Sequence, residues 1–262
     1  MTPYTLTTFT PAEVEKITGL TTTMQRDWRR RGFLPSNSGH ARFDAFGLAE
    51  ALVMKLLADR GIGPTLTKEI AHWCGVGIIW LILKDVDAYE GDHLRVFEWL
   101  PEDQRPASRS TGEDIDEEVR KLAEAAGIDV GLMGGSWGPK GSWLARQILR
   151  LRGCGGVVPA RHFIWWADGS HVWHVDLNKA FDGFSWDPRL SGPVIVLDLG
   201  ALASLMMERA GRAFVHVEFE TGEDGELLQP LEFGAVVPLE QLRSAPSSSS
   251  SESEPRDGGA ND

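Results

Sequence analysis

The sequence predicts an α+β protein, with a helical first part and a strand-rich second half. Apolar residues recur at helical spacing through the first 60 residues. Short apolar segments bounded by glycine, proline and aspartate dominate from residue 153 to residue 220. Apolar residues make up 42% of the 262 residues, enough for a packed core. We expect a helical N-terminal domain (1–75), a connecting segment and linker (76–113), an α+β C-terminal domain (114–243) and a disordered serine-rich tail (244–262).

The first two helices have clear start and stop signals. Residues 10–13, Thr-Pro-Ala-Glu, form a capping box with proline at the first helical position. Gly19 is suited to end this helix, and Thr21 is suited to cap the next one. Met24 and Trp28 then share one face of the second helix. Two short helices joined by a tight turn are typical of a helix-turn-helix.

A turn-rich stretch and a longer helix follow. Residues 35–43 contain proline, asparagine, serine and glycine between Phe33 and Phe43, which predicts a short β-hairpin. Leucines recur at helical spacing from residue 46 to residue 60 and predict a third helix. A further helix is expected at 67–73, and the apolar run 76–83 fits a buried helix or a buried strand equally well.

The second half alternates helices with strands. The turn Asp168-Gly169-Ser170 predicts a hairpin between its first two strands. The expected strands are 163–167, 171–176, 194–198 and 213–220, and the expected helices are 114–126, 142–152 and 199–210.

The N-terminal segment, over residues 8–70, resembles the DNA-binding domain of the MerR family. Residues 11–20 resemble the family's opening helix and turn, and Arg26-x-Trp28 followed by residues 31–34 resembles its Arg-x-aromatic and Arg-Gly-Leu-Leu segments. Gly39-x-x-Arg42-Phe43 resembles the wing, and 48–62 resembles the helix that ends in Arg-x-Leu-Gly-Phe. The resemblance implies a winged helix-turn-helix that binds double-stranded DNA. Typical members continue into a long coiled-coil helix that forms the dimer, whereas here Gly75, Gly77 and an all-apolar run interrupt any heptad pattern.

The charge distribution fits a confined DNA footprint. Residues 1–63 carry eight basic and six acidic side chains, a net charge of +2, which leaves −14 for the rest of the chain. Glutamine and arginine on a recognition helix can pair with adenine and guanine in the major groove. The alternative for the arginine run is a solvated helix end that complements the helix dipole. The candidate DNA-binding residues are Thr22, Thr23, Gln25, Arg26, Arg29, Arg30 and Arg31 in the second helix, with His40 and Arg42 in the wing.

Other chemical patterns favour structural roles. The glycine-rich stretch 134–142 lacks the spacing of a phosphate-binding loop, and His171 and His174 point to opposite faces of a regular strand. Asp176 and Asp198 lie at strand ends, where either catalytic acids or helix caps occur. Six tryptophans between residues 137 and 186 suit an effector pocket, a dimer face or an ordinary core. We expect no enzyme, no cofactor and no metal site.

These observations together predict a transcriptional regulator that binds DNA as a homodimer, through residues 21–31 and the 35–43 wing. The alternative is an excisionase-like or DNA-packaging architectural protein that uses the same domain. The C-terminal domain would provide dimerisation, a small-molecule effector site or a contact with RNA polymerase. The longest apolar run, 74–83, is shorter than a membrane span, and the N-terminus lacks a signal peptide, so we expect a cytoplasmic, nucleoid-associated protein without a membrane partner.

Overall fold

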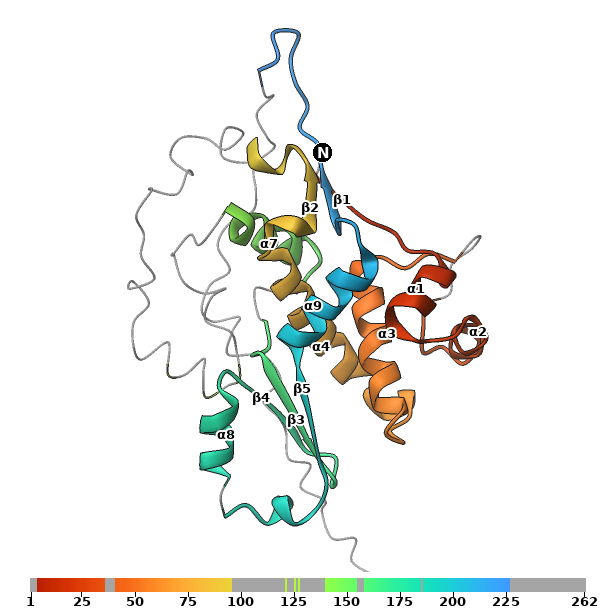
Figure 1. The fold of residues 1–262 in the computed structure, drawn as a ribbon, viewed down its shortest axis with the longest axis vertical. Coiled ribbons are helices and arrows are strands. Elements are labelled where there is room, and N and C mark those ends of the chain that lie inside the picture. Colours follow the sequence, from red (N-terminus) through yellow and green to blue (C-terminus); the bar gives the residue numbers. More distant parts are fainter. Residues whose placement is uncertain are drawn as a thin grey trace, which may run out of the picture.

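The protein has an α+β architecture, as the sequence predicted. The computed structural model describes residues 4–35, 41–95, 121, 125, 127, 140–154, 158–184 and 186–226. These residues form seven α-helices and two three-stranded sheets. In Figure 1, α1 to α3 lie on one side, the sheet of β3, β4 and β5 extends away from them, and α4 and α9 lie in the middle.

The elements have the following bounds. The helices are α1 (Pro11–Thr18), α2 (Thr22–Arg30), α3 (Ala45–Ala58), α4 (Pro64–Leu83), α7 (Lys140–Leu151), α8 (Leu177–Gly183) and α9 (Leu199–Ala210). The strands are β1 (Tyr4–Leu6), β2 (Tyr89–Gly91), β3 (His162–Trp166), β4 (His171–His174), β5 (Val194–Asp198) and β6 (Val215–Val217). Short 3-10 helices occur at Val86–Ala88, Asp92–Arg95 and Pro188–Ser191.

Local signals set the ends of the first two helices. The Thr10 hydroxyl accepts from the Glu13 amide at 3.3 Å, and the Glu13 carboxylate accepts from the Thr10 amide at 2.7 Å, which completes the predicted capping box. Gly19 ends α1 with φ 74°, a left-handed conformation that glycine adopts without strain. The Thr21 hydroxyl accepts from the Met24 amide at 3.2 Å and caps α2. Two short helices joined by a tight turn are therefore present at residues 11–30.

The long helix α4 forms the centre of the core. It continues through Gly75 and Gly77, so the undecided run 76–83 is helical and the expected boundary after residue 75 falls inside a helix. At Gly75, a Cβ atom would lie 3.2 Å from the backbone nitrogen of Glu50, so glycine lets α3 and α4 approach closely. Among the described residues, α4 is the one helix long and apolar enough to cross a membrane, yet 67% of its apolar window is buried, as in the core helix of a globular protein.

The smaller sheet joins the two ends of the described chain. Its strand order is β1-β6-β2, with β6 antiparallel to β1 and parallel to β2. Tyr4 pairs with Val217, and Tyr89 pairs with Val215. One continuous hydrophobic core includes Phe9 from the start of the chain and Phe214 from its second half, with ring centroids 5.6 Å apart. Residues of the expected N-terminal and C-terminal domains thus share a sheet and a core.

The second sheet has strand order β4-β3-β5, all antiparallel. The predicted turn at 168–170 connects β3 to β4, with Gly169 at φ 88°. Phe163 and Trp165 on one face of β3 join the main core. Trp166 on the other face packs edge-on against Phe184 beyond α8, at 5.1 Å between ring centroids. These two tryptophans are therefore core residues, whereas Trp186 is 95% exposed.

Candidate nucleic-acid interface

A buried glutamine holds α1 and α2 together. The Nε2 atom of Gln25 donates to the carbonyl oxygens of Pro11 and Leu20, both at 2.8 Å, and the residue is fully buried. Trp28, one turn later, is also buried. Gln25 was expected to contact bases, and its position corrects that prediction, because a side chain enclosed between two helices is not available to DNA.

The opposite side of α2 faces solvent. Thr23, Arg26 and Arg30 are all exposed, and their spacing of three and four residues places them on one face of the helix. The side chain of Arg30 is 81% exposed. Among the described residues, Arg26 has no ion-pair partner. Thr22 is half-buried at the start of α2, where its amide donates to the Glu15 carboxylate at 3.0 Å.

Asp27 forms ion pairs with two of the predicted arginines. It accepts from Arg30 at 2.6 Å and lies 3.6 Å from Arg31. The guanidinium of Arg31 also stacks over the Phe33 ring at 4.9 Å. Exposed pairs of this kind contribute about 0–1 kcal/mol to stability, so their exchange for a phosphate contact costs little.

Arg29 occupies a different environment. Its guanidinium lies 4.8 Å over the ring of Phe43, and one of its terminal nitrogens is buried without a hydrogen-bond partner in the described residues. Desolvation lowers its pKa from the ordinary arginine value. Arg29 therefore connects α2 to the residues before α3, and its side chain is only partly exposed.

The expected wing is described only at its base. Residues 36–40, which include the candidate His40, lie outside the described residues. The expected hairpin between Phe33 and Phe43 falls largely on residues 36–40. Phe43 itself pairs with Phe9 through two backbone hydrogen bonds of 2.7 and 3.0 Å. Arg42 is exposed next to this bridge. Hydrogen bonds from Thr10, with smaller contributions from Arg212 and Arg42, hold the pKa of Glu13 below its ordinary value.

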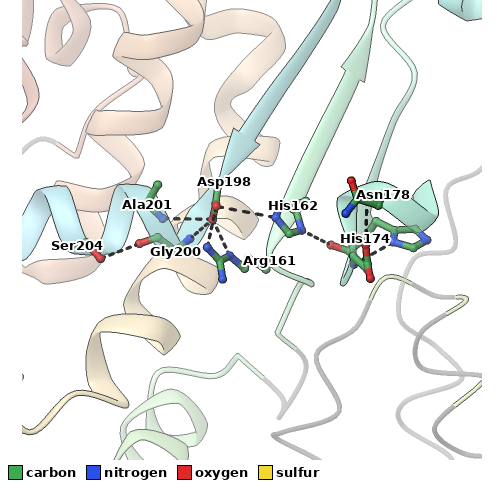
Figure 2. Close-up of polar contacts among 9 residues, drawn as sticks. Arg161, His162, His174, Asn178, Asp198, Gly200, Ala201 and Ser204 are labelled. Atoms are coloured by element: carbon green, nitrogen blue, oxygen red, sulfur yellow. Dashed lines mark hydrogen bonds and ion pairs between the residues drawn. The ribbon is translucent and has the colours of Figure 1, made fainter. Parts of the chain in front are cut away.

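A second polar cluster lies where β3, β5 and α9 meet (Figure 2). Arg161 forms a bidentate pair with Asp198, with both nitrogen–oxygen distances at 2.8 Å. The same carboxylate caps α9 by accepting from the amides of Gly200 and Ala201. His162 lies 3.9 Å from Asp198 on one side, and its Nδ1 atom lies 3.3 Å from the His174 carbonyl oxygen on the other.

This cluster forms the N-terminal cap of α9. The Arg161 hydrogen bonds, helped by the α9 amides, lower the pKa of Asp198 to about 2. Asp176 caps α8 in the same way, so both acids at strand ends are helix caps. A shallow depression of about 300 Å³ adjoins Arg161 and Ser204. No three histidine, cysteine, aspartate or glutamate side chains in the described part of the chain are grouped to hold a metal ion.

Comparison with known proteins provides no relative from which to transfer a function. No family model, curated protein or solved structure matches this chain.

Proposed function

We propose that this protein binds double-stranded DNA in a sequence-specific manner through a winged helix-turn-helix, as a transcriptional regulator. The recognition helix would be α2. The observation that carries the proposal is the exposed row Thr23, Arg26 and Arg30 on a helix whose other face is fixed by Gln25 and Trp28. A rigidly held helix with a polar, basic outer face suits insertion into the major groove.

The exposed residues at the two ends of α2 would contact different parts of the DNA. Arg26 and Thr23 lie in the first half of α2, which approaches base edges when such a helix enters the groove. Arginine can pair bidentately with guanine. Arg30 and Arg31 lie at the end of the helix, where they would contact phosphate and fix the register. Residues 22–31 contain four arginines and one aspartate, a net charge of +3 on a chain of net charge −12.

A homodimer is part of the proposal. One module of this size buries too little surface for a tight specific complex, so two copies that bind two half-sites are expected. The excisionase-like or DNA-packaging alternative predicts the same contacts. The positions of the bound sites, at promoters or at recombination and packaging sites, separate the two.

The test is selection from a random duplex library with the full-length protein, followed by affinity measurements on the selected duplex. Arg26→Ala is expected to weaken binding by about 1–3 kcal/mol and to relax preference at one base pair. Arg30→Gln is expected to weaken binding to all duplexes and to reduce the salt dependence by about one counterion.

The control is Lys179→Gln, which also removes one exposed positive charge, on a helix (α8) that lies on the opposite side of Figure 1 from α2. Equal effects of Arg26→Ala and Lys179→Gln, or the absence of any enriched sequence, would rule out sequence-specific binding through α2. Genome-wide mapping of bound sites with the native protein and Arg26→Ala then distinguishes a regulator from an architectural protein.

A further inference from the structure

Three arginines from the second half of the chain contact the N-terminal helices. Arg209, at the end of α9, donates to the carbonyl oxygen of Ile17 in the last turn of α1 at 2.7 Å. Arg212 pairs with Glu13 in the first turn of α1 at 2.9 Å. Arg152, after α7, pairs with Asp44, the N-cap of α3.

Each of these contacts has further support from its surroundings. Arg212 also donates to the Thr8 carbonyl oxygen at 2.9 Å and lies 4.7 Å over the Phe9 ring. Arg152 lies 4.9 Å over the ring of Phe46. Both ends of α1 and the start of α3 thus contact groups about 100 to 200 positions away in the sequence.

We propose that Arg209 and Arg212 are positioning residues for DNA binding, and that α9 and the residues directly after it are the segment through which the second half of the chain controls DNA affinity. This inference rests on the proposed function. Gln25 fixes α2 to α1, so a rotation of α1 moves the exposed face of α2 with it. The orientation of the recognition helix therefore depends on the contacts that hold α1.

Thermodynamic linkage makes this coupling reciprocal. If the contacts of α9 with α1 favour the DNA-binding orientation, then bound DNA must favour those contacts to the same degree. DNA that touches only α2 and the wing would consequently protect the backbone amides of α9. A direct contact between DNA and Arg209 or Arg212 predicts something different, namely a smaller salt dependence of binding when the arginine is removed.

The experiment uses the full chain and the duplex selected above. The variants are Arg209→Gln, Arg212→Gln and the conservative Arg209→Lys, which keeps a donor for the Ile17 carbonyl. The control is Arg189→Gln, which removes an arginine paired with Asp187 in the segment between α8 and β5. Duplex affinity, its salt dependence and amide hydrogen exchange in α1, α2 and α9 are measured for each, at a temperature where urea titrations show every variant to be folded.

Arg209→Gln and Arg212→Gln are expected to bind the duplex about fivefold more weakly with an unchanged salt dependence, and to exchange faster in α1. Arg209→Lys should restore most of the affinity, and Arg189→Gln should resemble the native protein. Duplex should slow exchange in α9 of the native protein.

Two results would overturn the positioning role. One is faster exchange in α1 with unchanged affinity, and the other is a reduced salt dependence, which would make the arginines direct DNA contacts. If the native protein enriches no duplex, the proposed function itself fails, whatever the exchange in α1 shows.

Discussion

Neighbouring residues in α2 have opposite roles. Gln25 is fully buried and donates two hydrogen bonds to backbone carbonyls, whereas Arg26 is exposed. Gln25→Ala removes both donated hydrogen bonds and creates a cavity, so it should lower the free energy of unfolding by about 2–3 kcal/mol. Arg26→Ala should change it by about 0.5 kcal/mol or less. Urea denaturation measures both, and similar losses for the two variants would contradict the assignment.

A second residue-scale prediction concerns Asp198. Its pKa of about 2 lies below the ordinary aspartate value, so its charge stabilises the fold above about pH 4 and this contribution is lost as the pH falls toward 2. Asp198→Asn keeps a capping side chain but loses the ion pair with the half-exposed Arg161, and it should cost about 1 kcal/mol at pH 7. The difference from the native protein should shrink between pH 5 and pH 2 in urea titrations. A difference in the free energy of unfolding that stays constant across that range would show that the charge of Asp198 does not contribute to stability.

At the scale of elements, the packing of α3 on α4 depends on the absence of a side chain at Gly75. A Cβ atom there would lie 3.0 Å from the Glu50 Cγ atom and 3.2 Å from its backbone nitrogen. Gly75→Val should therefore force the two helices apart and lower the free energy of unfolding by about 2–3 kcal/mol.

Gly183→Val at the end of α8 is the matched control, because a Cβ atom at Gly183 would meet nothing within 4 Å. Thermal or urea unfolding compares the two variants. A Gly75→Val protein as stable as Gly183→Val would mean that α3 and α4 have room to separate.

At the scale of the whole molecule, the shared sheet and core predict cooperative unfolding. β1 pairs with β6, and Phe9 packs against Phe214, so neither half can lose its structure without exposing the core of the other. We expect a single urea transition, coincident by circular dichroism and by tryptophan fluorescence. Two separated transitions would instead support independent domains at 1–75 and 114–243.

The candidate site could be predicted only in part from the sequence. Helix ends, caps and net charge follow from local residue order, so α2 and its arginines were found. Which side of α2 faces solvent depends on how α1 packs against it. Gln25 was therefore placed on the wrong side, because a polar residue type does not show whether its side chain is buried against hydrogen-bond partners within the protein.

The sequence by itself determined the elements whose signals are local. The capping box at Thr10, the cap at Thr21 and the turn at Gly169 act within a few residues, and all three are present. Only the tertiary structure decided which distant segments meet. The strands β1 and β2 have three residues each, too few for a periodic pattern. Their pairing with β6, which lies within the predicted strand 213–220, arises from long-range burial of apolar surface. The same long-range burial places Arg209 and Arg212 next to α1, and no residue spacing in the sequence predicts these contacts.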